Sequence, residues 1–447
     1  MPELIDIATT VAGWADDHEE VEAFVVHERE TEVRAYRGDV ESLTSAESRG
    51  IGVRVVVGGR QGYAYAGTLD DDALRETLAE ARDNAAFAEH DEHNGVAVPD
   101  GCVTADLDLL SEELAGFAVD DKVALAIELE AATRAADPRI SGIESAEYVD
   151  AIAEVAVATS TGIATSSRES GCYLSAYALA EADGETQTGF GFSIGRSPAS
   201  LDISEAAADA ADRATRLLGA VKPPTRRLTV VLDPWVTAQL LGVIGHTLTG
   251  EAVLKGRSFF ADRFGDEVAV EGFTLVDDAT DPAAFPASII DGEGLATRPT
   301  ALIEAGVLRG FLHTSDSGRR AGAASTGSAV RAGFAGAPGV GAQALRLTPG
   351  HRSPADIIAD VDDGLLVQGV AGLHSGVNPV SGDFSTGGEG LMIRGGELAE
   401  PGREVTIAST LQRLLLDITA IGDDQQGLPR SAAGTTLAVA DVTMSGA

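Results

Sequence analysis

Hydrophobic and polar residues alternate over two long blocks of the N-terminal half, and segments with helical spacing follow each block. Residues 21–67 and 142–195 carry apolar side chains at about every second position, which predicts half-buried β-strands. The pair Gly58-Gly59 predicts a tight hairpin turn inside the first block. Apolar residues recur every three or four positions in three further segments, which we predict to be helices: 70–90, 120–136 and 204–220.

The two strand blocks contain stretches with a similar order of residue types. Residues 42–55 (SLTSAESRGIGVRV) and 162–176 (GIATSSRESGCYLSA) both run from a serine-rich stretch into a glycine and then into a strand. This order favours an internal duplication of the N-terminal domain. The matched stretch is short, so chance similarity is the alternative.

The pattern changes at VKPPTRR (221–227), where two prolines precede a short apolar strand. We therefore expect two domains, an N-terminal α+β domain (1–221) and a C-terminal β-rich domain (222–447). The second half opens as strand, helix and strand, and then becomes rich in glycine, with a predicted hairpin turn at Ala305-Gly306. So many glycine turns favour a mostly antiparallel, barrel-like sheet over a doubly wound one. The predicted fold class is α+β.

The charge balance is strongly acidic. The chain has 70 acidic and 32 basic residues, a formal net charge of −38, and its only lysines are Lys122, Lys222 and Lys255. An acidic, lysine-poor surface is typical of proteins that work in concentrated salt, where ions screen the self-repulsion, so we expect a halophilic source. Most of these acids are interpreted as a solvated surface. Without a basic patch, nucleic acid is not an expected partner.

The start of the chain and the cysteine content point to a soluble protein. The first 20 residues lack a basic stretch followed by a long apolar run, so we predict no signal peptide. No apolar run approaches the ~20 residues that a membrane span needs. Cys102 and Cys172 are too few for a disulfide framework or a four-cysteine zinc site. We expect a cytoplasmic location.

Two common catalytic motifs are absent from the sequence. The three lysines precede Val, Pro and Gly, which excludes a P-loop for phosphate. No Gly-x-Ser-x-Gly elbow occurs, which disfavours an α/β-hydrolase. The segment GFGFSIG (189–195) resembles a nucleotide-binding loop only superficially, because its alternation is that of a strand.

His246, in LLGVIGHTLTG (240–250), is the residue that raises the question of a metal site. Zinc peptidases hold the metal with histidines about one helical turn apart and place a glutamate beside the first as general base. Leu241, Gly242 and Val243 lie one turn upstream of His246, and none can ligate a metal or accept a proton. Glu251 lies five residues downstream, an awkward distance for the same helix face. On these residues alone, we interpret His246 as a packed or capping histidine.

The whole chain resembles the TldD/PmbA family. The resemblance is carried by GIGVRVVVGGRQGYAYAG (50–67) in the first half and, in the family's order, by several C-terminal stretches. These stretches are LLGVIGHTLTGEAVLKGRSFFADRFGDEVAV (240–270), DGEGLATRPTALIEAGVLRGFL (291–312), STGSAVRAG (325–333), NPVSGDFSTGGEGLMIRGGEL (378–398) and IGDDQQGLPRSAAGTTLAVADVTMSG (421–446). The resemblance implies a protein linked to peptide hydrolysis.

The family has two branches, and the resemblance places this chain in one of them. The TldD branch is a metallopeptidase with His-Glu-x-x-x-His and a downstream cysteine as third zinc ligand. Alignment on Gly245-His246 puts Leu241 at the first histidine and Gly242 at the glutamate, and no cysteine occurs in 422–430. The chain thus resembles the TldE (PmbA) branch, which lacks the zinc site, so we expect no metal in this chain.

That resemblance implies a heterodimer with a TldD-like metallopeptidase subunit, which would carry the zinc. This chain would then help to shape a cavity for short or unfolded peptides bound in extended form. The stretch 381–390 is expected near the peptide path, because its glycines let another backbone approach a sheet edge. The residues expected to contact peptide are Ser381, Gly382, Asp383, Phe384 and Ser385. An ordinary glycine-rich turn is the alternative for this stretch.

Two other functions stay open, so the sequence leaves enzymatic activity undecided. The chain could be a metallopeptidase in its own right, with replacement ligands drawn from His246, Glu251, Asp423 and Asp424. It could also be a homodimeric peptide-binding protein with no enzyme attached. The metal content of the pure chain separates the first alternative from a metal-free subunit.

The acidic surface generates a prediction about salt. Moving the protein from molar potassium chloride to dilute buffer lengthens the Debye length from about 3 Å to 30 Å and restores repulsion among the carboxylates. We expect loss of structure or aggregation in dilute buffer, measured by circular dichroism during thermal unfolding. Equal thermal midpoints in dilute and molar potassium chloride would contradict the inferred halophilic origin.

Overall fold

The computed structural model describes residues 3–447, apart from the side chain of His374. The first half contains helices α1 (Leu4–Ala12), α2 (Asp71–Phe87), α3 (Glu112–Ala115), α4 (Val119–Ala136) and α5 (Ile203–Arg216), and a 3-10 turn at Pro198–Ser200. Its strands are β1 (Glu19–Tyr36), β2 (Asp39–Val57), β3 (Arg60–Ala66), β4 (Ile140–Thr159), β5 (Ala164–Ala182) and β6 (Glu185–Gly195). The helices predicted at 70–90, 120–136 and 204–220 are therefore confirmed.

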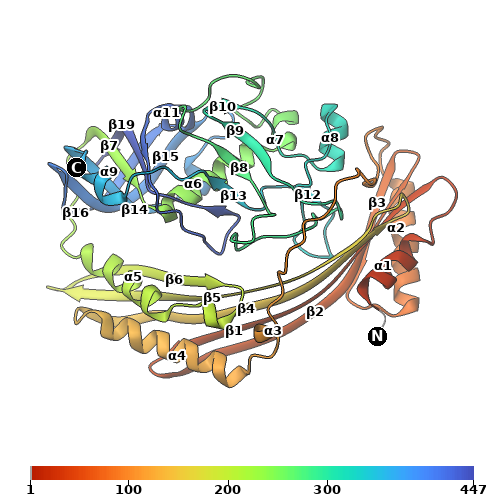
Figure 1. Ribbon diagram of the computed structural model, residues 1–447, viewed down its shortest axis with the longest axis horizontal. Coiled ribbons are helices and arrows are strands. Elements are labelled where there is room, and N and C mark those ends of the chain that lie inside the picture. Colours follow the sequence, from red (N-terminus) through yellow and green to blue (C-terminus); the bar gives the residue numbers. More distant parts are fainter. Residues whose placement is uncertain (1–2) are drawn as a thin grey trace.

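These six strands form one curved antiparallel sheet in the order β3-β2-β1-β4-β5-β6 (Figure 1). Each half of the sheet is a three-stranded meander with a helix before it and a helix after it, and the first strands of the two meanders, β1 and β4, pair at the centre. The two stretches that echo each other in the sequence lie in the corresponding strands β2 and β5. This arrangement has the symmetry expected of an internal duplication.

The predicted turn at Gly58-Gly59 joins β2 to β3. Both glycines have positive φ, 54° and 74°, which side chains with a Cβ rarely adopt. A Cβ on Gly59 would also lie 2.9 Å from the backbone oxygen of Asp91. The sequence pair thus sets both the turn conformation and its close packing.

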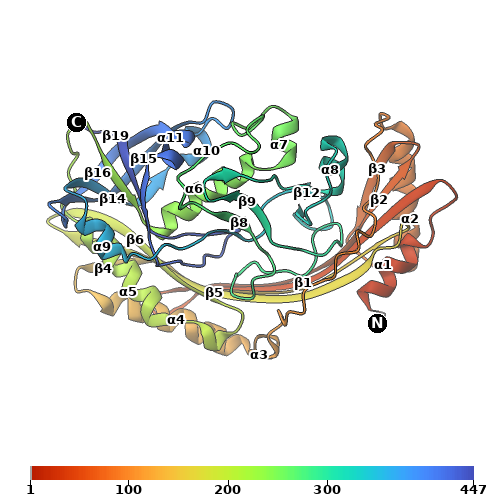
Figure 2. The ribbon, with the colours of Figure 1, turned by 45° about the horizontal axis from the view of Figure 1, so that its top comes forward.

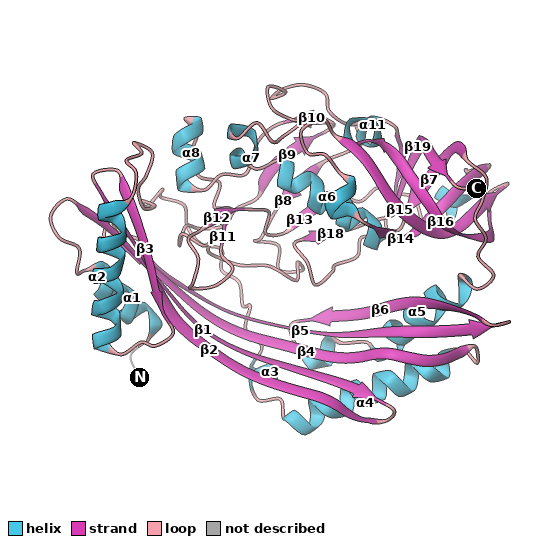
Figure 3. Ribbon diagram, turned by 180° about the vertical axis from the view of Figure 1, so that it is seen from behind, coloured by secondary structure: helices cyan, strands magenta, loops and turns pink. Residues whose placement is uncertain are grey.

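The alternation along β1 assigns the two faces of the sheet. Odd positions such as Val21, Val25 and Val33 are fully buried in the clusters formed with the surrounding helices. Even positions such as Glu22 and Phe24 meet residues of the C-terminal half. Figures 2 and 3 show α4 and α5 on the outer side of the curved sheet and the C-terminal half within its concave side.

The C-terminal half contains a closed barrel. Its helices are α6 (Pro234–Thr247), α7 (Gly250–Leu254), α8 (Ser315–Ala321), α9 (Pro354–Ala359), α10 (Leu373–Gly376) and α11 (Leu411–Leu416). Its strands are β7 (Arg226–Leu232), β8 (Leu275–Asp277), β9 (Thr300–Glu304), β10 (Val307–Leu308), β11 (Ala329–Val330), β12 (Gly339–Val340), β13 (Leu345–Leu347), β14 (Asp363–Ala371), β15 (Asp383–Arg394), β16 (Glu397–Thr410), β17 (Ile418–Ile421), β18 (Ala432–Ala433) and β19 (Leu437–Ser445). The order β16-β15-β14-β7-β19 closes because β19 also pairs with β16.

The predicted α+β class with a mostly antiparallel, barrel-like second half is confirmed. Every pairing in the barrel is antiparallel except that of β7 with β14. The predicted turn at Ala305-Gly306 joins β9 to β10, and both residues have positive φ. Within the described residues, no helix is long and apolar enough to cross a membrane.

A buried ion network fixes the C-terminal half to the sheet. Glu22 on β1 accepts hydrogen bonds from Arg54 on β2, at 2.5 Å, and from Arg331 of the C-terminal half. Arg54 also meets Glu293 at 3.3 Å, and all four side chains are at most 4% exposed. Burial alone would raise the pKa of Glu22, but the two guanidinium groups outweigh burial and hold that pKa below its usual value.

Removing one cation from this network leaves a buried carboxylate undercompensated. We expect Arg331→Met to lower the free energy of unfolding by about 3–5 kcal/mol. Chemical denaturation in molar salt measures the change. The control Arg227→Met removes an exposed pair with Asp441 and should cost about 1 kcal/mol or less. Equal effects of the two substitutions would mean that the network does not hold the halves together.

Candidate functional site

Helix α6 begins directly after the barrel strand β7, and its first turn is fixed by Asp233. The Asp233 carboxylate accepts the backbone N–H of Val236 at 2.8 Å, and Pro234 occupies the first helical position. Asp233 also accepts a hydrogen bond from Arg213 of α5 at 2.6 Å. Burial raises the pKa of Asp233, and Arg213 offsets part of that rise. The helix is therefore anchored to both halves of the molecule.

The two sides of α6 have opposite environments. Leu240, Leu241 and Ile244 are buried in the core of the C-terminal half. His246 is exposed, so of the two interpretations, a packed or a capping histidine, the packed one is wrong. His246 lies in the last turn of α6, and its role as a capping residue stays a prediction. His246 is exposed because no other described segment covers this side of α6. One turn earlier on the same side, a Cβ added to Gly242 would contact nothing within 4 Å. The small residues that suggested a core leave one side of the helix uncovered.

This uncovered side of α6 forms one wall of a cavity of about 620 Å³. The residues that line the cavity come from α6, from 373–379 and from 430–432: Ala238, Gln239, Gly242, Val243, His246, Thr247, Leu373, Val377, Pro379, Arg430, Ser431 and Ala432. Gln239, Gly242, Val243 and His246 follow the i, i+3, i+4, i+7 spacing of one helix face. That spacing was visible in the sequence, whereas the contribution of Arg430 was not.

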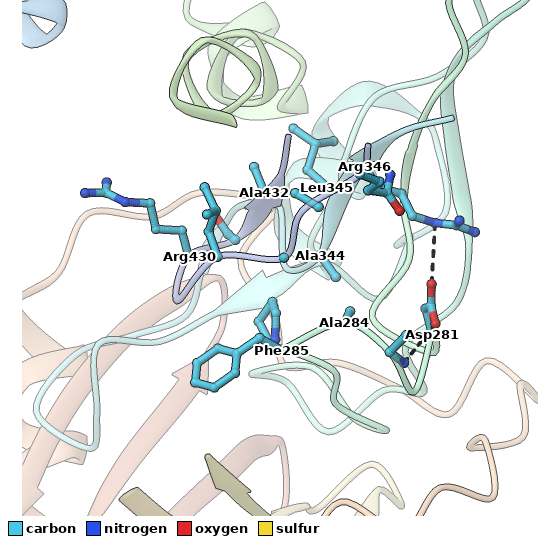
Figure 4. A pocket seen from close by; sticks show the side chains of 15 residues that line it. Asp281, Ala284, Phe285, Ala344, Leu345, Arg346, Arg430 and Ala432 are labelled. Atoms are coloured by element: carbon cyan, nitrogen blue, oxygen red, sulfur yellow. Dashed lines mark hydrogen bonds and ion pairs between the residues drawn. The ribbon is translucent and has the colours of Figure 1, made fainter. Parts of the chain in front are cut away.

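A second, smaller cavity of about 180 Å³ shares Arg430, Ser431 and Ala432 with the α6 cavity (Figure 4). Arg346 and Asp281 line this cavity and lie 3.8 Å apart, and Arg346 also lies 3.5 Å from Asp278. Figure 4 shows the Arg430 side chain extending away from Asp281 and Arg346. The guanidinium carbon of Arg430 lies 4.9 Å from the centre of the Trp235 ring, in a cation–π contact.

The residues at α6 do not fit a zinc ion. A catalytic zinc site takes three protein ligands from His, Cys, Asp and Glu, and His246 is the one such residue in the described lining of the cavity. Leu241, at the first histidine of the family motif, is 1% exposed and points into the core. Across the described part of the chain, no three such side chains lie together in a way that could hold a metal.

The other proposed replacement ligands, Glu251, Asp423 and Asp424, do not line the α6 cavity with His246. Glu251 pairs with Lys255 on α7, and Asp424 accepts hydrogen bonds from the hydroxyl groups of Thr435 and Thr436. Asp423 is exposed, and its backbone N–H donates to the carbonyl of Arg352. The structure therefore does not bring these three residues together with His246 as a metal site.

The residues expected to bind peptide lie at the start of β15. Ser381, Asp383 and Ser385 are exposed, whereas Phe384 is buried in the core. Gly382 has a φ of 79°, and a Cβ there would lie 2.1 Å from Gln412 Oε1, so this glycine serves the local fold.

Strand β15 is not a free sheet edge. It lies between β16 and β14, and Phe384 forms a further bridge with Val377. Addition of a peptide strand along β15 would therefore have to displace existing pairings. Contact of peptide with the exposed side chains of 381–385 stays a prediction.

The fold defines an α+β protein in which two strand–helix units of the same order form a curved sheet around a barrel, and the barrel carries a cavity at α6. Comparison with known proteins agrees with this class along nearly the whole chain. The models for PmbA/TldA metallopeptidase domain 1, central domain and C-terminal domain match residues 21–85, 112–218 and 225–446. The chain belongs to the PmbA/TldA metallopeptidase family.

Individual relatives support the same assignment. Metalloprotease PmbA of Escherichia coli O157:H7 is 27% identical over 87% of this chain and 84% of its own length. A metalloprotease of Methanothermobacter thermautotrophicus is 30% identical over 50% of this chain and 49% of its own length. The crystal structure of TldE from Thermococcus kodakarensis has the same fold, with a TM-score of 0.88, 22% identity, and 96% and 97% of the two chains covered. The division of this chain into two domains at residue 221 stays a prediction.

Proposed function

We propose that this chain is the subunit without a metal site in a TldD–TldE type metallopeptidase complex that cleaves short or unfolded peptides. The observation that carries the proposal is the composition of the α6 cavity. His246 is present there, but the positions of the other motif residues are a buried leucine and a glycine with no side chain. The TldE structure and the PmbA relatives support placing the chain in that branch.

In this proposal the catalytic zinc belongs to a TldD-like partner, and this chain supplies part of the peptide-binding wall. The α6 cavity is suited to that task because its volume of about 620 Å³ lies in the range of small-ligand sites, about 300–1,000 Å³. Its walls are largely apolar, and a few polar groups, including Gln239 and Arg430, are available to orient a bound chain. No step of peptide hydrolysis is assigned to residues of this chain.

We also propose that the complex works in the cytoplasm of a halophile. The support is the net charge of −38 and the near absence of lysine. A peptide-binding homodimer is the second candidate, because the α6 cavity has the volume and the largely apolar walls of a ligand site, whereas its described lining offers a zinc ion only His246. The two candidates differ in whether any peptidase activity depends on this chain.

Reconstitution tests the proposal. This chain and a TldD-like chain are assayed separately and then mixed, against an unstructured peptide in molar salt. We expect cleavage only from the mixture, because the metal site and the peptide wall lie on different subunits. Full activity from the TldD-like chain alone, or cleavage by this chain alone, would overturn the proposal.

A substitution in the cavity sharpens the same test. Gly242→Trp places an indole in open space on a helix face, so we expect it to lower cleavage at least tenfold while the heterodimer still forms. The control Ala124→Trp adds the same side chain to an exposed position of α4, on the far face of the sheet, and should leave cleavage unchanged.

A further inference from the structure

The α6 cavity has an unusual charge for this protein. Acidic residues outnumber basic ones by 70 to 32 in the chain, yet no aspartate or glutamate is found among the described residues that line the cavity. Arg430 lines it instead, together with His246 of α6. A cavity with a fixed cation, no anion and apolar walls is complementary to a ligand that carries one negative group beside an apolar one.

Arg430 lacks a carboxylate partner among the described residues, in contrast to the other arginines nearby. Arg213 pairs with Asp233 at 2.6 Å, and Arg346 faces Asp278 at 3.5 Å. The Arg430 side chain instead lies over the face of the Trp235 ring. Stacking of this kind leaves the edge of the guanidinium group, with its N–H donors, open to another partner.

The position of Arg430 is set by an aromatic platform. The Trp235 ring lies 4.6 Å from the ring of Phe190 and 5.4 Å from that of Phe192, measured between ring centres. Both phenylalanines belong to β6, so the first turn of α6 rests on the edge of the large sheet. A cation held on such a platform loses little further freedom when it binds an anion.

We propose that the α6 cavity binds the free C-terminal carboxylate of a peptide that ends in an apolar residue. Arg430 binds the carboxylate, for which the planar guanidinium fork provides two parallel N–H donors. The last side chain of the peptide lies against the apolar wall formed by Val243, Leu373, Val377 and Pro379. This assignment rests on the proposed function, because it takes a peptide as the ligand, and it adds which end of the peptide is recognised.

The test measures binding to this chain alone, without a partner and without cleavage. The probe is a pentapeptide of four alanines and a C-terminal leucine, labelled at its N-terminus and followed by fluorescence anisotropy in the salt that keeps the protein folded. It is used as the free acid, as the C-terminal amide, and as an amide with glutamate at the fourth position. We expect the free acid to bind at least about tenfold more tightly than either amide.

Substitutions locate the effect. Arg430→Gln should abolish the preference, so that the free acid and the plain amide bind equally. Arg430→Lys should keep part of the preference because it retains the charge without the fork. The control Arg134→Gln removes an exposed arginine on α4 and should keep the full preference. Thermal unfolding of each variant verifies that it is folded.

Equal binding of the free acid and the plain amide to the unaltered protein would overturn the inference, as would the absence of measurable binding for all three peptides. Tight binding of the glutamate amide would assign the carboxylate to an acidic side chain and overturn recognition of the C-terminus. These results are independent of the reconstitution assay. Cleavage by a complex can depend on this chain even if the chain does not bind the peptide C-terminus. Conversely, the chain can bind that C-terminus even if no complex with a TldD-like subunit forms.

Discussion

The pairing of Glu22 with Arg54 and Arg331 is the interaction on which the arrangement of the two halves depends. Two strands of the sheet and a loop of the C-terminal half meet at one buried carboxylate. Arg331 also donates to the carbonyl oxygens of Gly292 and Gly336, so the same guanidinium group organises the loops that face the sheet. A buried charge that loses its partner destabilises the fold strongly. The network is therefore complete only when the two halves keep this relative position.

The start of α6 is one of the places where the two halves meet. With the barrel seated in the concave sheet, Trp235 at the start of α6 meets Phe190 and Phe192 of β6, and Arg213 reaches Asp233 from α5. One side of the helix is buried in the core of the C-terminal half. The other side has only Gly242 at its middle, and it stays open to whatever the chain binds.

Much of the fold was predictable because strands, helices and glycine turns have local signals. The turn at Gly58-Gly59 and the alternation along β1 are examples, since each depends on neighbouring residues. The state of His246 was not predictable in the same way. The small and apolar residues next to His246 in the sequence suggest a buried position. Residues far away in the sequence, however, decide which side of α6 is covered. Arg430 gave no signal at all, because its role comes from contact with Trp235 across the fold.

The central claim is that this chain carries no zinc site of its own, and elemental analysis tests it most directly. The chain is produced without any TldD-like protein, purified in molar salt, treated with a mild chelator, and then equilibrated with zinc and dialysed. The account predicts far less than one zinc per chain. Zinc is usually bound by His, Cys, Asp and Glu side chains, and among the described residues that line the α6 cavity only His246 is of these types. One tightly held zinc per chain, lost on His246→Ala, would contradict it.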